Sequence, residues 1–288
     1  MSVRLTEKAK TVGFMRLFEA EWRRLWKRRS VRLMAFTAPL AAMLSAVYLL
    51  SNNQRLDPGL PEYATAGNVP VLALAEMLIT VFSGMMLVLA GLTVTEEYRG
   101  GQLRMVMLRA ASLTRIIAAK WLACLAFVFI QLLLYLGCCV VIGKMVFPNP
   151  DTYPLFYDAG IVSYAQGLLY DLEYYGLATL ALAVLLTVFF GIATIGRSST
   201  AALGLGIGFL LLSYAFPTML AYFRPLLDTQ VYFRLHFSSL LMIEWEGLAA
   251  MIANLHGLAL WNISVLAGYG VVFGGMTALI WKRRDSFE

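Results

Sequence analysis

The residues best placed to do chemistry lie in one charged stretch between two long apolar runs, from Thr95 to Lys120. The stretch opens with the run Glu96-Glu97-Tyr98-Arg99-Gly100-Gly101. Acids and bases this close together form ion pairs, and two successive glycines permit a sharp turn. The pattern therefore indicates ion pairing and the transmission of movement rather than catalysis of a covalent reaction.

After the glycines, the segment from Gln102 to Ala110 has the spacing of an amphipathic helix. Its apolar face is formed by Leu103, Val106, Met107 and Ala110, at positions i, i+3, i+4 and i+7, with Arg104 and Arg109 beside it. A short helix on a tight turn fits a groove on a soluble partner. We expect Glu96 and Glu97 to anchor it by pairing with Arg104 or Arg115.

The acidic pair, the glycine turn and Leu103, followed by Ser112-Leu113-Thr114-Arg115 and Ala118-Ala119-Lys120, resemble one loop of the ABC-2 type permeases. These are the membrane subunits of ATP-binding cassette exporters, and the loop joins their second and third spans. The resemblance implies a coupling helix that fits a cleft on a separate ATPase subunit. One departure is Ala110-Ala111, where many members carry a proline, so we expect a longer helix. The alternative is a basic loop held by lipid charge.

The chain has no GxxxxGK[ST] motif, and its Gly143-Lys144 pair lies at the end of an apolar run. We therefore expect it to bind no ATP through a P-loop of its own. The resemblance implies that ATP and Mg²⁺ are bound by the partner ATPase, and that this chain is not itself an enzyme and holds no cofactor or metal. The motifs HExxH and GxSxG are also absent, and we interpret His236 and His256 as structural.

Composition predicts an integral membrane protein. Of the 288 residues 60% are hydrophobic, and the mean hydropathy is +0.73. The net charge of +6 does not favour a nucleic-acid partner, because the basic residues gather beside the apolar runs, where lipid headgroups lie.

These patterns predict an all-α fold with six transmembrane helices in residues 33–281. The expected spans are 33–50, 69–94, 121–147, 176–195, 201–223 and 258–281. Pro39 predicts a bend in the first span. Residues 1–32 predict an amphipathic elbow helix in the headgroup plane, with its aromatic side chains inserted, and 282–288 a short tail. Residues 224–257, which include Glu244 and Glu246, predict short outer helices that dip into the interface or re-enter it.

The basic residues also predict the orientation. With six spans, nineteen of the 23 fall on the face that carries both termini, and four fall on the other. The first face is then cytoplasmic, which places the predicted coupling loop on the ATP side of the cell membrane.

Two further pairs of residues call for an interpretation. Glu76 and Lys144 are charged residues inside apolar spans and either line a substrate route together or reach separately to the interface, which we favour. Gly204 and Gly208 lie on one face of the fifth span, where small residues allow close helix packing. The resemblance implies that this span meets a second permease copy or a related permease.

The expected function is export by alternating access, driven by ATP hydrolysis in the ATPase subunit. Family members carry drugs, peptide antibiotics and lipid-like molecules, among others, and the sequence does not choose between them. The alternative is an ion-gradient-driven secondary transporter, which needs an ionisable group near the membrane midplane. A membrane enzyme would need clustered acids, whereas the acids of this chain appear scattered through outer loops.

Overall fold

The computed structural model describes residues 13–99, 112–155, 161–253 and 255–286, with the side chains of 97–99, 256 and 284–286 left aside. Six of its helices are long and apolar enough to cross a membrane. They run over Arg29–Asn53, Val69–Glu96, Leu113–Val146, Tyr164–Gly196, Ser199–Ala221 and Leu258–Arg283. The expectation of a multi-pass, all-α membrane protein is therefore confirmed, and each span overlaps its predicted range.

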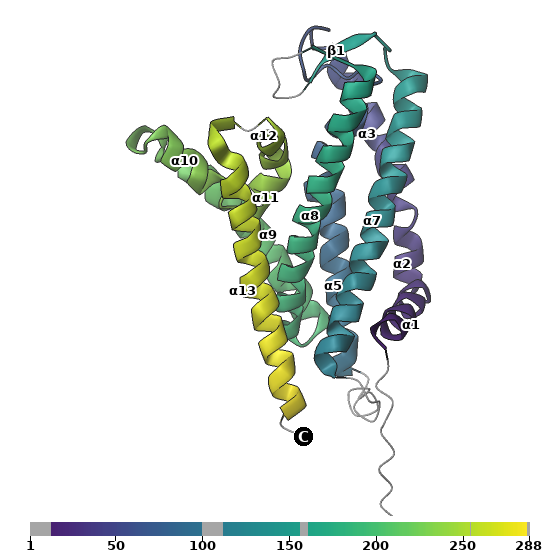
Figure 1. Ribbon diagram of the computed structural model, residues 1–288, viewed down its shortest axis with the longest axis vertical. Coiled ribbons are helices and arrows are strands. Elements are labelled where there is room, and N and C mark those ends of the chain that lie inside the picture. The colour runs from purple at the N-terminus through teal and green to yellow at the C-terminus, as the bar shows by residue number, and fades with distance from the viewer. Residues whose placement is uncertain (1–12, 100–111, 156–160, 254, 287–288) are drawn as a thin grey trace, which may run out of the picture.

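The chain begins with α1 (Phe14–Trp26), a short helix that packs across the lower part of α7 (Leu113–Val146) (Figure 1). The first span consists of α2 (Arg29–Met34) and α3 (Thr37–Asn53). The break between them falls just before Pro39, which has no N–H to give to the carbonyl one turn earlier. The predicted bend is thus present, a few residues on the N-terminal side of the proline.

The second span also has an irregular turn. It consists of α4 (Val69–Met77), a π-helical turn η1 (Leu78–Phe82) and α5 (Ser83–Arg99). The backbone N–H of Ser83 donates to the carbonyl of Leu78, and the Ser83 hydroxyl also lies 2.9 Å from this carbonyl. The apolar run gave no sign of the interruption.

Between the third and fourth spans, two short strands form an antiparallel hairpin, β1 (Thr152–Pro154) and β2 (Ile161–Ser163), with Tyr153 opposite Val162. The following helix, α8 (Tyr164–Gly196), begins twelve residues earlier than the predicted start at Gly176. The amide side chain of Gln166 accepts from the backbone N–H of Ser163 at 3.0 Å and so caps this end of the helix. We call this end of the molecule the hairpin end, and the opposite one the α1 end.

After a tight link, α9 (Ser199–Ala221) crosses back. Residues 224–257 then fold as η2 (Arg224–Leu226), α10 (Thr229–His236), α11 (Leu240–Met242), the π-helical turn η3 (Ile243–Gly247), α12 (Leu248–Ile252) and η4 (Leu255–Gly257). The last helix, α13 (Leu258–Ser286), returns to the α1 end. The segment from α11 to α12 is largely buried against other helices of the chain.

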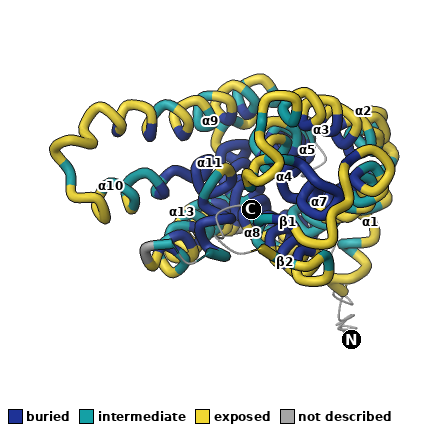
Figure 2. Tube along the Cα trace, turned by 90° about the horizontal axis from the view of Figure 1, so that it is seen from above, coloured by how far each residue is buried: buried dark blue, intermediate teal, exposed yellow. Residues whose placement is uncertain are grey.

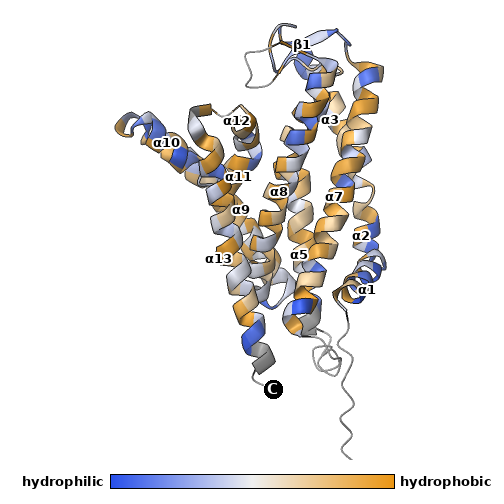
Figure 3. Cartoon of the chain, in the orientation of Figure 1, coloured by the Kyte–Doolittle hydropathy of each residue, from blue (hydrophilic) through white to orange (hydrophobic). Residues whose placement is uncertain are grey.

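The core of the bundle lies along α5 and α8. In their spans 61% and 67% of the most apolar window is buried, against 11% in α13 and 22% in α9. Seen from above, the buried residues gather in the middle of the molecule and the exposed ones along its rim (Figure 2). Hydrophobic residues occupy most of the length of the spans, and hydrophilic ones gather on α1, on α10 and at the lower ends of α5 and α13 (Figure 3). This distribution is typical of helices that face lipid.

Candidate functional site

The described ends of the predicted coupling loop, the last turn of α5 and the first turn of α7, both lie at the α1 end of the bundle (Figure 1). Seven of the residues predicted to couple, Gly100, Gly101, Leu103, Arg104, Val106, Met107 and Arg109, fall outside the described residues, as do the side chains of Glu97 and Arg99. Of the predicted coupling residues, the structure therefore describes the side chains of only Glu96 and Arg115, at the two ends of this loop.

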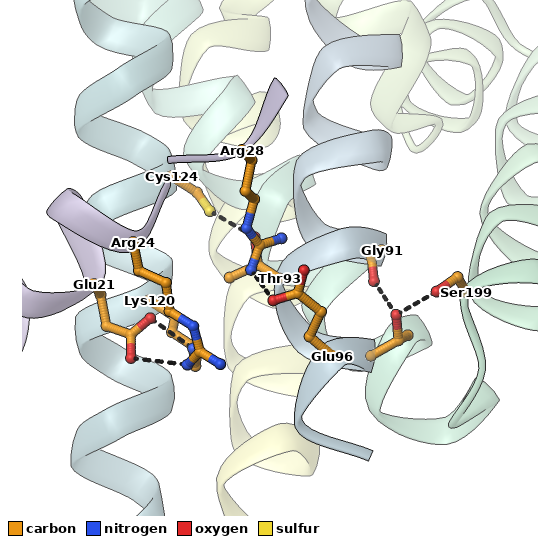
Figure 4. A network of polar contacts seen from close by, with 10 residues as sticks. Glu21, Arg24, Arg28, Gly91, Thr93, Glu96, Lys120, Cys124 and Ser199 are labelled. Carbon is orange, nitrogen blue, oxygen red and sulfur yellow. Dashed lines mark hydrogen bonds and ion pairs between the residues drawn. The ribbon is translucent and has the colours of Figure 1, made fainter. Parts of the chain in front are cut away.

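Glu96 is held by the N-terminal segment rather than by its own loop. The Arg28 guanidinium, in the extended residue between α1 and α2, donates through Nη2 to Glu96 Oε2 at 2.5 Å (Figure 4). The predicted partners were Arg104 and Arg115, and Arg115 is an exposed residue on α7. Glu96 thus has a partner that was not predicted, and a pairing with Arg104 lies outside the described residues. The contact joins residues 68 positions apart, which local spacing does not reveal.

A second ion pair fixes α1 to α7. The Lys120 ammonium is completely buried and lies 2.6 Å from Glu21 Oε2, while Arg24 lies 3.8 Å from the other oxygen of the same carboxylate (Figure 4). The burial of Glu21 was not predicted, although the sequence contains a signal for it. Glu21 shares its helix face with Phe18, Trp22 and Leu25, and an acid on an apolar face predicts a buried charge.

Aromatic packing completes the attachment of α1. The Trp26 ring meets the Phe127 ring of α7 edge to face, with centroids 5.6 Å apart, and Trp22 meets Trp26 in the same way. Leu25 is buried. Part of the apolar face of α1 therefore packs on protein, whereas we expected its aromatic side chains to be inserted into lipid.

The last turn of α5 also contacts the link between α8 and α9. The Thr95 and Ser199 hydroxyls lie 2.7 Å apart, and Thr95 Oγ1 is 2.6 Å from the carbonyl of Gly91 (Figure 4). Arg197 closes α8 in the left-handed conformation, and the Ser198 hydroxyl caps α9 by accepting from the N–H of Ala201. The base of the predicted coupling loop thus contacts α2 and α9, and α7 continues from its other end.

The predicted dimer residues face outward. A Cβ atom added to Gly204 or to Gly208 meets no atom within 4 Å, so both lie on an open face of α9. Gly206, between them, packs inward, because its added Cβ would approach Leu87 of α5 to 2.1 Å. Close packing within one chain therefore does not account for Gly204 and Gly208.

Glu76 and Lys144 are not brought together as a pair. Glu76 lines a cavity of about 430 Å³ at the hairpin end, whereas the Lys144 ammonium lies 4.9 Å from the centroid of the Tyr164 ring. The favoured interpretation, two side chains with separate surroundings, agrees with this geometry.

Sequence reasoning placed Glu244 among the scattered outer acids, and in this it was wrong. Its side chain is completely buried, and its Oε2 atom accepts a hydrogen bond of 2.8 Å from the Ser83 hydroxyl. His236, farther out on α10, lies 3.9 Å from Glu246. Burial lowers the pKa of His236, against the opposing effect of the Glu246 carboxylate. That contact is therefore weak as an ion pair at neutral pH.

Comparison with known proteins yields one family. The family described as protein of unknown function (DUF2705) matches residues 39–287, from α3 to the last residues of the chain. No curated protein matches the sequence.

Proposed function

Because the chain belongs to the DUF2705 family of proteins of unknown function, its activity has to be argued from its own residues, and we propose that it is the permease subunit of an ABC exporter. The observation that carries the proposal is the base of the loop between α5 and α7. There Glu96 is paired with Arg28 and Lys120 with Glu21. A loop that transmits force needs its ends fixed to several spans, and these contacts link α1, α2, α5 and α7.

In this proposal the α1 end faces the cytoplasm, and the segment 100–111 docks on an ATPase subunit. ATP closes the ATPase pair, the docked loops approach each other, and the movement passes through α5 and α7 into the bundle. The spans then open outward and release a drug, peptide or lipid-like substrate. Since α5 is among the most buried spans, a displacement of its end is transmitted to the core.

A second permease copy, or a related permease, completes the transporter. The open face of α9 around Gly204 and Gly208 is the proposed contact, because only backbone lies there and a partner helix can approach closely. A Gly208→Trp variant should then elute as a smaller species in mild detergent. An unchanged elution volume for a folded variant would place the contact elsewhere.

The test of the function is co-purification from the native host. The detergent-solubilised chain should bring down an ATPase, and Leu103→Asp should abolish both the association and the transport-linked ATP hydrolysis. Leu60→Asp, at an exposed apolar position between α3 and α4, is the matched control and should leave both intact. A stable chain that purifies alone, without ATPase activity, contradicts the proposal.

One observation favours the second candidate, a secondary transporter driven by an ion gradient. Such a transporter needs an ionisable group deep in the membrane, and Glu244 is buried against the second span. The discriminating measurement is flux into liposomes that contain this chain alone. Uptake driven by a pH or sodium gradient without ATP favours the second candidate, and its absence favours the ABC permease.

A further inference from the structure

Glu244 is a buried carboxyl group that the proposed coupling mechanism does not use. It lies in the π-helical turn η3 and has no exposed surface. Its Oε2 atom is held by the Ser83 hydroxyl, whereas its Oε1 atom is buried and has no hydrogen-bond partner among the described residues. A buried carboxyl oxygen without a donor is rare in folded proteins, and its presence calls for an explanation.

The position of Ser83 gives the height of this carboxyl group in the bundle. Ser83 lies 14 residues after Val69 and 13 residues before Glu96, the two ends of the second span. The Glu244 carboxyl therefore lies at half-height of a helix long enough to cross a membrane. Ionisable groups at that depth are costly and usually functional.

Two π-helical turns meet at this point. The turn η3 packs against the turn η1 of the second span, and the Ser83 hydroxyl is also 2.9 Å from the Leu78 carbonyl of η1. π-Helical turns interrupt regular helices mainly at functional sites. Here they place a carboxyl group on one helix and a hydroxyl group on the other in direct contact.

Among the described residues, no cation lies within hydrogen-bond distance of the carboxyl group. The elements packed closely against η3 are α4, η1, α8, α11 and α12, and none of them contains a lysine, an arginine or a histidine. Their ionisable residues are Glu76 on α4 and, on α8, Asp171, Glu173 and several tyrosines. The turn η3 itself adds Glu246, and His236 of α10 lies 3.9 Å from that carboxylate. An isolated carboxylate in such surroundings is so unfavourable that the group takes up a proton instead.

A cavity lies against the turn that carries Glu244. The two residues that follow Glu244, Trp245 and Glu246, line the cavity of about 430 Å³ that opens among α3, α4 and η3. Glu62, Glu76 and Arg55 also line it, so its walls carry three acids and one base. An acidic cavity concentrates cations, including hydronium, next to the turn that carries Glu244.

We propose that Glu244 is a proton-binding site at half-height of the bundle, loaded from the cavity at the hairpin end. A hydronium ion in the cavity gives its proton to Oε1, an O–H bond forms there, and a water molecule remains. Ser83 holds the other oxygen and so leaves Oε1 free to receive the proton. Release is the reverse step. The site does not depend on the ATPase partner, and it would make transport sensitive to pH on the cavity side.

Infrared spectroscopy of the purified full chain in lipid nanodiscs tests the proposal. A protonated carboxyl group has a carbonyl stretch that carboxylates and amides lack, and it shifts in D₂O. The difference between the wild type and Glu244→Gln should contain one such band, which is lost as the pH rises. Glu62→Gln, at the cavity wall, should keep the band, and Glu244→Asp should restore a shifted one.

A second variant tests the route by which a proton reaches Glu244 from the cavity. Ala75→Trp fills the cavity beside Glu76 and should slow the exchange of the band in D₂O without removing it, whereas Ala221→Trp, exposed on α9, should not. A wild-type spectrum identical to that of Glu244→Gln overturns the proposal. So does a band that responds neither to pH nor to D₂O, and exchange unaffected by Ala75→Trp overturns the route. The chain is measured alone, so these results are independent of ATPase co-purification.

Discussion

The α1 end and the middle of the bundle each bury an ionisable side chain, but the surroundings of the two side chains differ. At the α1 end the ammonium of Lys120 is completely enclosed and lies 2.6 Å from the Glu21 carboxylate. At half-height the Glu244 carboxyl is equally enclosed, and its only described hydrogen-bond partner is the Ser83 hydroxyl. The first group has a counter-charge, whereas the second has none in contact with it among the residues that the structure describes.

This difference in counter-charge indicates different roles for the two groups. A paired buried charge holds its geometry, because removing one partner leaves the other uncompensated. An unpaired carboxyl group is stable only in its neutral form, so its state follows the supply of protons. The ion pair of Lys120 therefore fixes α1 to α7, whereas Glu244 is suited to change its protonation, as we propose for this site.

The largest effect is expected from Lys120→Met. Without the ammonium, Glu21 remains partly buried with only the more distant Arg24 nearby, and the free energy of unfolding should fall by about 3–5 kcal/mol. The measurement is unfolding of the purified chain in detergent. The double variant Glu21→Gln/Lys120→Met should recover most of the loss. A single variant as stable as the wild type would show that the pair does not hold α1.

Substitutions at half-height should have a smaller effect. Ser83→Ala removes the only described donor to Glu244 and should cost about 1–3 kcal/mol. Glu244→Gln should cost less than about 1 kcal/mol, because the amide keeps an acceptor for Ser83 and has no charge to desolvate. The same unfolding assay compares the two. If Glu244→Gln were as damaging as Lys120→Met, Glu244 would be a compensated charge like those of the α1 end.

The smallest effect on stability should come from Glu96→Gln. The Glu96 side chain is 44% exposed, so its ion pair with Arg28 contributes about 0–1 kcal/mol. In the proposed permease, however, the ratio of transport to ATP hydrolysis should fall clearly. Arg23→Ala breaks the exposed pair with Glu19 on α1 and is the matched control. Equal coupling in both variants would remove Glu96 from the mechanism.

Several elements were predictable because their signals are local. Each span appeared as an apolar run, and the break near Pro39 follows from the missing N–H of proline. The start of α8 was placed too late, because the polar residues of its first turns, such as Asp171, suggested a loop, whereas the cap at Ser163 starts the helix. The β-hairpin was missed, since strands of three residues give too short a pattern.

The candidate functional residues likewise divide into those that have a local sequence signal and those that have none. Glu96 was selected as a candidate from its place beside the glycine turn, but its partner Arg28 was not, because the pair spans 68 residues. Glu244 was named only as part of a segment expected to dip into the interface or re-enter it, and its burial was not predicted, since its apolar surroundings are too short to be recognised as a span. Glu244 and Glu246 both stand in one short apolar segment, yet Glu244 is buried and Glu246 is not. Only the direction in which η3 packs distinguishes them.

The sequence by itself determined that this chain crosses a membrane with six helices and carries a charged loop between the second and third. These properties depend on the length and polarity of continuous segments, because these decide whether a segment is more stable in lipid or in water. Only the tertiary structure decided that Lys120 has a counter-charge, whereas Glu244 contacts none in the described part of the chain. A buried charge is compensated by whichever side chains distant segments bring within a few ångströms, and no local pattern contains that distance.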